Sequence, residues 1–303
     1  MQTILGAGGV IGTELAKILP EHTKTIRLAG RNPKHVLGSE ELVKCDLTDA
    51  SQTMNAVENS DVVYLTAGLE YNYDVWKEKW PKIMTNDLEA CKRHRAKLVF
   101  FDNVYMYGRV EGWMKENTPV NPVSRKGEIR AKIAGQLLEE AASGNVRALI
   151  ARSADFYGPG ADSTFVKMLV FDKLINNKKA SWLGSDEVFH SFTYTPDAAR
   201  ATALLGNTPD AYNQVWHLPT HRNALTGAEF IEYAAGLIDA DPDYRIIKRW
   251  MAKLAGLFDP LVKETVEMMY QYEHDYLFDS GKFENAFFKP VPYEEGIAKC
   301  MGK

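Results

Sequence analysis

The sequence predicts an α/β protein of the Rossmann type, in which a doubly wound parallel sheet is joined to a smaller C-terminal α+β lobe that would bind substrate. Short apolar runs alternate with helical patterns through the first half of the chain, and the first run ends in a glycine-rich turn. After about residue 160, aromatic-rich pieces mix with short helices. Strands that alternate with helices of this length favour a parallel sheet covered on both faces.

Six strands are expected in the first half of the chain, at Gln2–Leu5, Thr25–Ala29, Glu41–Cys45, Asp61–Thr66, Lys97–Phe101 and Arg147–Arg152. The helices expected between them are Val10–Leu19, Asp49–Glu58, Trp76–His94 and Ser124–Ala142. The predicted domains are a Rossmann-type domain at residues 1–160 and a substrate lobe at 161–303. Within that lobe, residues 190–218 are expected to contribute the last elements of the sheet.

Composition excludes several classes of protein. The 303 residues are 45% hydrophobic, and 36 basic against 40 acidic side chains give a net charge of −4, which disfavours nucleic acid as a partner. No stretch approaches the roughly 18 consecutive apolar residues of a membrane span. Three widely spaced cysteines, Cys45, Cys91 and Cys300, predict neither a disulfide framework nor a metal site. We expect a cytoplasmic protein with a small-molecule substrate, and a homodimer is left open.

The most specific motif is the turn Gly6-Ala7-Gly8-Gly9-Val10-Ile11-Gly12, which follows a strand and opens a helix. Gly6 permits a tight turn, Gly8 and Gly9 remove side chains that would block a pyrophosphate, and Gly12 lets the helix pack on the sheet. The backbone N–H groups at the helix start, around Val10 and Ile11, would face the phosphates. An ordinary strand–helix turn is the weaker alternative in this setting.

The end of the second strand predicts which dinucleotide is bound. Arg31 stands nineteen residues after Gly12, where NAD sites usually place an acidic residue. A guanidinium suits a 2′-phosphate, so NADP is preferred over NAD, unless Arg31 is simply an exposed strand-end residue. Asp46, followed by Leu47, would accept from the adenine amino group or cap the next helix.

Several landmarks in order resemble the extended short-chain dehydrogenase/reductase family, of the sugar-nucleotide epimerase/dehydratase type. They are Gly6-x-x-Gly9-x-x-Gly12, Leu65-Thr66-Ala67-Gly68, Asn86, Tyr107-Gly108, Phe156-Tyr157-Gly158-Pro159-Gly160, Phe192–Ala199 and Asn213–Leu218. The resemblance covers nearly the whole chain. It implies that the cofactor lies against Thr66, Ala67, Gly68, Asn86 and Phe156, and it suggests a sugar nucleotide as one class of substrate.

The catalytic positions depart from that family's pattern. Its chemistry uses a Tyr-x-x-x-Lys pair on a helix and a Ser or Thr on the fifth strand, but no tyrosine occurs between Asn117 and Ala142. By the resemblance, Lys126 stands at the tyrosine position, Arg130 at the lysine position and Asn103 at the Ser/Thr position. All three catalytic positions are therefore altered.

Two replacements for the lost proton donor are considered. Lys126 would act as a general acid if the fixed charge of Arg130, four residues later, destabilised its ammonium. Alternatively, Tyr105 or Tyr157 would donate the proton. The plainer alternatives are a solvated basic helix start for Lys126 and Arg130 and aromatic packing for the tyrosines.

Four residues are candidates for the substrate side of the site. Asp102, beside Asn103, ends a central strand and would face the cofactor crevice or cap the next turn. Asp155 would bind substrate or pair with Arg152. Tyr71 belongs to an aromatic cluster that would stack on a flat or sugar-like ligand, or serve as a packing or dimer contact. Tyr157 is the fourth candidate.

These observations predict an NAD(P)-dependent oxidoreductase or epimerase-like enzyme that acts on a carbonyl or hydroxyl carbon with atypical catalytic residues. Asn103 would orient the oxygen, while Lys126 or a nearby tyrosine would handle the proton. The loss of the usual catalytic set supports an alternative of another class, a non-catalytic sensor that binds NADP(H) and signals to a partner.

Overall fold

The computed structural model describes residues 1–303 and divides into two compact units. The first unit combines Met1–Met106, Lys126–Ser153 and Pro196–Leu218, and the second combines Tyr107–Arg125, Ala154–Thr195 and Pro219–Lys303. The units therefore interleave along the chain, whereas the sequence predicts a boundary at residue 160 with residues 190–218 returning to the sheet.

The first unit is built on a seven-stranded parallel sheet with the order β12-β7-β5-β4-β1-β2-β3. The strands are β1 (Gln2–Leu5), β2 (Ile26–Gly30), β3 (Glu41–Lys44), β4 (Val62–Leu65), β5 (Lys97–Asp102), β7 (Ala148–Arg152) and β12 (Val215–His217). The strand order reverses between β1 and β4, which is the point where this fold binds ligands beyond the carboxyl ends of its strands. Each of the six predicted strands is present within one residue, so the predicted fold class is confirmed.

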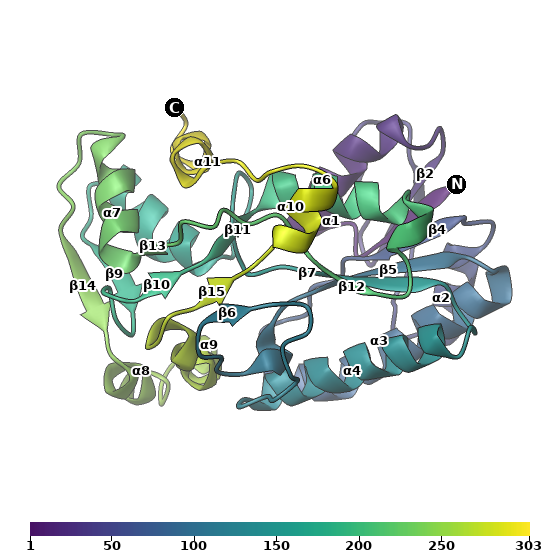
Figure 1. Ribbon diagram of the computed structural model, residues 1–303, viewed down its shortest axis with the longest axis horizontal. Helices are drawn as coiled ribbons and strands as arrows, with labels where there is room; N and C mark the ends of the chain where they lie inside the picture. Colours follow the sequence, from purple (N-terminus) through teal and green to yellow (C-terminus); the bar gives the residue numbers. More distant parts are fainter. The chain divides into compact units, whose positions relative to one another are not determined.

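Helices cover both faces of this sheet (Figure 1). One face carries α1 (Val10–Ile18) and α6 (Thr195–Gly206), and the other carries α2 (Ala50–Val57), α3 (Tyr73–His94) and α4 (Arg125–Ala142). Helix α3 begins three residues before its predicted start, because the side chain of Asn72 accepts hydrogen bonds from the backbone N–H groups of Asp74 and Val75.

The core on the α3 side of the sheet follows from helical spacing. Trp76, Trp80, Ile83, Met84 and Leu88 recur three or four residues apart and are all buried against the strands. Strands β1, β4 and β7 are buried along their whole length, as expected for a parallel sheet covered on both faces. This packing fixes the carboxyl ends of the strands, where the candidate site residues lie.

The second unit consists of short strand pairs and helices. Its strands are β6 (Trp113–Met114), β8 (Asp155–Tyr157), β9 (Ala180–Leu183), β10 (Phe189–His190), β11 (Phe192–Tyr194), β13 (Leu225–Thr226), β14 (Tyr244–Ile247) and β15 (Leu277–Phe278). Its helices are α5 (Asp172–Ile175), α7 (Gly227–Gly236), α8 (Arg249–Ala255), α9 (Pro260–Thr265), α10 (Gly281–Ala286) and α11 (Tyr293–Cys300). An aromatic core that includes Trp182, Phe192, Phe230 and Tyr272 packs β8, β9, β11, β14, α5, α7 and α11 together.

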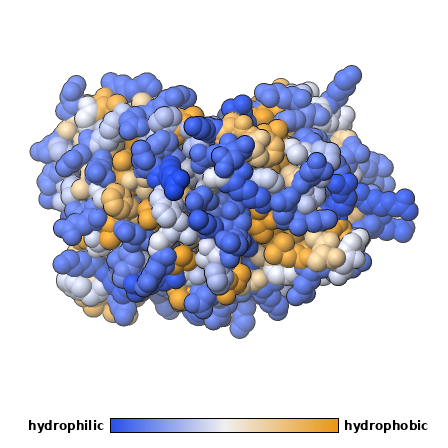
Figure 2. Space-filling view, viewed as in Figure 1, coloured by the Kyte–Doolittle hydropathy of each residue, from blue (hydrophilic) through white to orange (hydrophobic).

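The surface of the molecule mixes polar and apolar side chains. On the face shown in Figure 2, hydrophobic patches are scattered among hydrophilic residues. The most exposed large apolar side chains, Leu257 and Phe258, lie in the turn between α8 and α9. None of the helices combines the length and the apolar character needed to cross a membrane.

Candidate functional site: a nucleotide pocket and the strand ends beside it

The glycine turn has the shape that its sequence predicts. Gly6 adopts a positive φ of 86°, and a Cβ atom on it would overlap the backbone of Ala67, so no other residue fits there without a shift. A Cβ on Gly12 would lie 2.9 Å from Cα of Ala7, which explains how closely α1 packs on the turn. A Cβ on Gly8, in contrast, would meet nothing within 4 Å. The turn is therefore tight where it packs and open where a ligand would lie.

The start of α1 is suited to an anion. Gly9 is the N-cap residue and makes no side-chain cap hydrogen bond, so no side chain covers the N–H groups of the first turn, which includes Val10 and Ile11. The positive end of the helix dipole lies at the same place. These features fit the pyrophosphate of a dinucleotide, as the motif predicts.

A cavity of about 560 Å³ opens next to this turn. Its lining combines the glycine turn, the ends of β2 and β3, the loop after β4 and one face of α3: Gly6, Gly8, Gly9, Gly30, Arg31, Asn32, Pro33, Cys45, Asp46, Leu47, Thr48, Ala67, Gly68, Leu69, Lys79 and Ile83. Of the predicted cofactor residues, Gly6, Gly8, Gly9, Arg31, Asp46, Leu47, Ala67 and Gly68 are thus brought together around one space.

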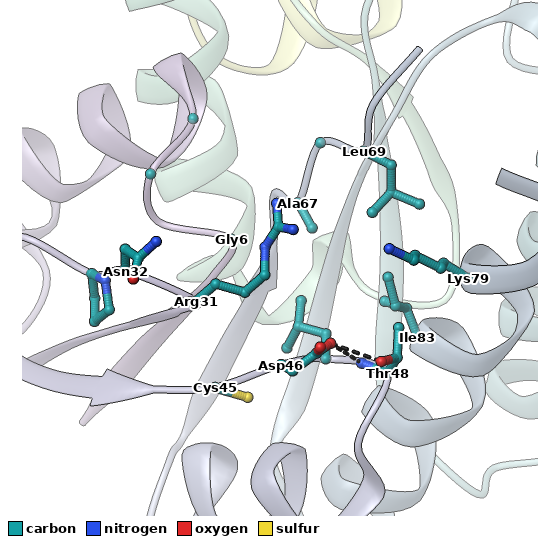
Figure 3. A pocket seen from close by; sticks show the side chains of 16 residues that line it. Gly6, Arg31, Asn32, Cys45, Asp46, Thr48, Ala67, Leu69, Lys79 and Ile83 are labelled. Atoms are coloured by element: carbon teal, nitrogen blue, oxygen red, sulfur yellow. Dashed lines mark hydrogen bonds between the residues drawn. The ribbon is translucent and has the colours of Figure 1, made fainter. Parts of the chain in front are cut away.

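Two cationic side chains, Arg31 and Lys79, point into this cavity from different elements (Figure 3). Asp46, in the loop between β3 and α2, also lines it. Asp46 accepts hydrogen bonds from the backbone N–H and the hydroxyl of Thr48, at 2.9 and 2.8 Å. These bonds, together with the positive charges of Lys79 and Arg31, lower the pKa of Asp46 below its usual value. Helix α2 is capped by Asp49 rather than Asp46, so the capping alternative for Asp46 is wrong.

Two further predicted residues support the cavity from behind. The side-chain amide of Asn86 donates to the carbonyl of Leu47 at 2.9 Å, which ties α3 to the loop after β3. The hydroxyl of Thr66 donates to the carbonyl of Leu5 at 3.2 Å, which joins the ends of β4 and β1. Both contacts hold the backbone that lines the pocket.

A buried ion-pair network lies at the ends of β5 and β7. Nε of Arg130 lies 2.7 Å from Oδ1 of Asp102, and a second guanidinium nitrogen contacts the same oxygen. Nε of Arg152 lies 3.4 Å from Oδ2 of Asp102. The Arg130 guanidinium also stacks near Trp80 and Phe100, at 4.4 and 4.9 Å from the ring centroids. Asp102 therefore holds Arg130 and Arg152 at the carboxyl ends of β5 and β7.

Asn103 continues this arrangement into the next turn. Its backbone N–H donates to Oδ1 of Asp102 at 2.9 Å, and its side-chain carbonyl accepts from the N–H of Tyr105 at 3.1 Å. These contacts agree with the alternative in which both residues cap the turn. The carbonyl of the Asn103 side chain is thus occupied, and its amide N–H groups remain as donors.

Lys126 lies at the start of α4 and is 0% exposed, while Arg130 is 4% exposed. The expectation of a solvated basic helix start is therefore wrong, because α4 turns this face inward. The Lys126 ammonium lies 4.6 Å from the ring centroid of Tyr71. Tyr71 and Tyr105 both pack on Trp76, with ring centroids 5.9 and 6.2 Å away, so the aromatic cluster lies against Lys126 and Arg130.

The second unit places Asp155 in a titratable cluster of its own. Oδ2 of Asp155 lies 3.1 Å from Nε2 of His190 and accepts from the hydroxyl of Tyr272 at 2.8 Å. Asp155 therefore pairs with His190, and the alternative pairing with Arg152 is wrong. Tyr157 is buried in an aromatic cluster with Tyr194 and Tyr293, with centroids 5.3 and 5.6 Å away, which agrees with the packing alternative. Phe156 lies between Asp155 and Tyr157 on β8 and does not line the nucleotide cavity.

Sequence reasoning missed Lys79 and His190. Lys79, Ile83 and Asn86 are spaced four and three residues apart on α3, so they share one face of the helix. Because Asn86 was predicted to lie at the cofactor, this spacing could have predicted that Lys79 and Ile83 face the same site. His190 precedes the strand Phe192–Tyr194, but the sequence holds no signal for its pairing with Asp155.

Comparison of the sequence with models of protein families shows to which family the chain belongs. The model of the NAD dependent epimerase/dehydratase family matches residues 3–217, which is more than half of the chain. The chain belongs to this family. Membership in the epimerase/dehydratase family makes the protein an enzyme with a nicotinamide cofactor, as the glycine turn and the sheet predict.

Known relatives of this epimerase/dehydratase agree with that assignment. An uncharacterized UDP-glucose epimerase of Bacillus subtilis (strain 168), YtcB, is 24% identical over 229 residues, covering 67% of this chain and 72% of the relative. A double mutant of the dTDP-glucose 4,6-dehydratase DesIV from Streptomyces venezuelae, solved with NAD, has a TM-score of 0.83 at 16% identity and covers 100% of this chain and 96% of its own. MoeE5, solved with UDP-glucose and NAD, has a TM-score of 0.80 at 20% identity and covers 99% of this chain and 97% of its own. The shared fold thus extends over both units.

Proposed function

We propose that this member of the family prefers NADP(H) and moves a hydride at a carbonyl or hydroxyl carbon of a small molecule, with a sugar nucleotide as the first substrate class to test. The proposed cofactor preference rests on the position of Arg31. It lines the pocket at the point where NAD sites use an acidic residue. The printed names of the relatives, a UDP-glucose epimerase and a dTDP-glucose 4,6-dehydratase, support the substrate class.

The residues of the pocket fit a dinucleotide with an extra phosphate. Gly8, Gly9 and the start of α1 would hold the pyrophosphate, and Asp46 would accept from the adenine amino group. The fork of Arg31 matches a 2′-phosphate, which it can bind through two parallel hydrogen bonds. When bound, the nicotinamide supplies the hydride chemistry. The relatives above were solved with NAD, so the preference for NADP is a property we propose for this chain.

Lys126 is the proposed proton-handling residue. It is buried at the start of α4 beside the Tyr71 ring, at the position where the family pattern has its tyrosine. Arg130 follows one helical turn later and is held by Asp102, so it places a fixed positive charge on the same helix face. Tyr105, which packs on Trp76, is the alternative donor.

Asn103 would orient the substrate. The amide N–H groups of Asn103 would donate to the reacting oxygen, because the carbonyl of that side chain is already bonded to Tyr105. Asp102 acts as a positioning residue for Asn103 and Arg130. In the second unit, Asp155 is 20% exposed at its side chain, and Oδ2 accepts from Tyr272. Its remaining oxygen, Oδ1, would accept a substrate hydroxyl.

The cellular setting and assembly are part of the same proposal. Three free cysteines, two of them buried, suit the reducing conditions of the cytoplasm. The homodimer stays a prediction, to be checked by light scattering of the purified protein.

Turnover tests the proposal. The protein is incubated with NADP or NADPH and a panel of UDP- and dTDP-sugars and simple carbonyl compounds, while nicotinamide absorbance and product NMR spectra are recorded. We expect a net absorbance change for a reductase, or a new sugar isomer without one for an epimerase. Reaction only with simple carbonyls would replace the sugar-nucleotide class. Tight NADPH binding without any turnover would contradict the catalytic proposal and favour the sensor.

A further inference from the structure

A second cationic side chain, besides Arg31, lines the nucleotide pocket, and the family motifs in the sequence do not include it. Lys79 lies in the second turn of α3, is half-buried, and lines the cavity together with Ile83. In Figure 3 its ammonium points into the space that the Arg31 guanidinium enters from the end of β2. The two cations come from elements on different sides of the cavity, so a ligand between them would meet both.

Neither Lys79 nor Arg31 forms an ion pair with a carboxylate within 4 Å. Two other lysines of α3 are neutralised along the helix: Nζ of Lys82 lies 3.0 Å from Glu78, and Nζ of Lys92 lies 2.8 Å from Glu89. The charge of Lys79 is thus directed at the cavity and not at its own helix.

The charges that line the cavity do not cancel. Its ionisable residues are Arg31, Lys79, Asp46 and Cys45. Burial raises the pKa of the Cys45 thiol to about 11, so it is neutral at pH 7. Asp46 is ionised and already bonded to Thr48. Two cations against one carboxylate leave one net positive charge in the pocket, which favours an anion beyond the pyrophosphate held by the glycine turn.

We propose that Lys79 is the second half of a two-cation clamp, with Arg31, that selects a phosphate on the adenosine ribose. This inference rests on the proposed NADP preference and deepens it. A phosphate monoester carries between about 1.5 and 2 negative charges at pH 7, more than one guanidinium neutralises. Arg31 offers a planar fork for two oxygens, and Lys79 adds a point charge from the opposite wall.

The clamp makes a prediction that a lone Arg31 does not. Removing Lys79 weakens the binding of ligands with a ribose 2′-phosphate by about tenfold, which is a loss of about 1.4 kcal/mol. It leaves ligands without that phosphate unaffected, because the adenine and pyrophosphate contacts come from other residues.

The experiment uses two small probes without a nicotinamide, 2′,5′-ADP and 5′-AMP, so that it is independent of catalysis. Isothermal titration calorimetry gives their dissociation constants for the wild type and for Lys79→Met, Lys79→Gln and Arg31→Met. Lys77→Met is the matched control, because Lys77 lies on the same helix outside the cavity, with Nζ 5.9 Å from the Tyr73 ring. We expect both Lys79 variants to bind 2′,5′-ADP about tenfold more weakly and 5′-AMP within twofold of the wild type, while Lys77→Met matches the wild type for both. Lys79→Arg should restore part of the lost affinity.

The outcomes separate this inference from the proposed function. If the Lys79 variants keep the wild-type affinity for 2′,5′-ADP while Arg31→Met loses it, Lys79 is not part of the clamp and the NADP preference stands on Arg31 alone. Equal losses for both probes would also overturn the assignment, because Lys79 would then serve the adenosine in general. If the wild type itself binds 5′-AMP as tightly as 2′,5′-ADP, the NADP preference fails together with the clamp.

Discussion

The guanidinium of Arg130 is clamped against the carboxylate of Asp102, with Nε 2.7 Å from Oδ1, in an almost fully buried position. Arg130 stands at the position of a lysine in the family pattern, yet its charge is engaged by an acidic residue at the end of β5. The pair therefore fixes the face of α4 from which Lys126 emerges one turn earlier.

Asp102→Asn is expected to destabilise the protein by about 3–5 kcal/mol, because it leaves the buried charges of Arg130 and Arg152 without their carboxylate. Urea unfolding measures the change. Glu140→Gln is the control, since Glu140 pairs with Lys92 at 2.8 Å where both side chains are 25% exposed. That surface pair should contribute less than about 1 kcal/mol. Similar losses in the two variants would show that the Asp102 network adds no more than a surface pair.

Lys126→Met should reduce turnover by at least about 100-fold on whichever substrate the panel identifies, since general acid–base groups contribute roughly 10²–10⁴-fold. NADPH affinity should stay near the wild-type value, because Lys126 does not line the nucleotide cavity. Lys132→Met, at an exposed position of the same helix, is the control. Unchanged turnover in Lys126→Met would remove this residue from the mechanism and direct attention to Tyr105.

Asp87 gives the protein a measurable pH dependence. It is fully buried in α3, neither carboxyl oxygen has a hydrogen-bond partner, and burial raises its pKa well above the usual value. The folded state keeps this proton while the unfolded state releases it above pH 4. Stability from this residue therefore falls as pH rises, by about 1.4 kcal/mol per pH unit while the folded carboxyl stays protonated.

Asp87→Asn removes that proton equilibrium. We expect the free energy of unfolding to fall less between pH 5 and pH 7 in Asp87→Asn than in the wild type, because the variant has no carboxyl proton to lose on unfolding. Urea titrations at the two pH values measure it. Parallel pH profiles for the two proteins would show that Asp87 is ionised, and so partnered, in the folded state.

Glu40 acts at the acidic end of the pH scale. Its buried side chain accepts from the N–H groups of Val36, Leu37 and Gly38 in the loop that follows Arg31. Burial alone would raise the pKa of Glu40, but these bonds outweigh it and lower the pKa to about 2. This contribution to stability is complete above the ordinary value of 4.5 and is lost as pH falls towards 2.

Glu40→Gln should therefore cost about 1–3 kcal/mol at pH 7 and progressively less below pH 4. Thermal unfolding followed by circular dichroism at pH 7 and pH 3 measures this difference. Glu21→Gln, at an exposed position, should change neither value. A loss that is the same at both pH values would contradict the assigned ionised state of Glu40.

The parts of this structure that follow from local patterns could be predicted from the sequence. The glycine turn, the strands and the helices depend on residues close together in the chain, and Gly6, Arg31 and Asp46 lie around one cavity because they end neighbouring strands. The partners of charged groups could not be predicted in this way. Asp102 and Arg130 are 28 residues apart, and Asp155 lies 117 residues from Tyr272, so only the folded chain shows these pairs.

The burial of charged side chains also could not be predicted from the sequence. A lysine and an arginine at a helix start are usually solvated, and composition alone cannot show that α4 turns Lys126 and Arg130 inward. What permits this burial for Arg130 is the carboxylate of Asp102 together with the rings of Trp80 and Phe100. Those partners come from β5 and α3, elements that precede α4 in the chain.

The most direct test of this account is the affinity of the wild-type protein for NADPH and NADH, measured by nicotinamide fluorescence in the same buffer, with Arg31→Met alongside. The pocket predicts that NADPH binds at least about tenfold more tightly, and that the gap shrinks in Arg31→Met because NADPH binding weakens while NADH binding does not. Equal affinities in the wild type, or tighter binding of NADH, would contradict the account.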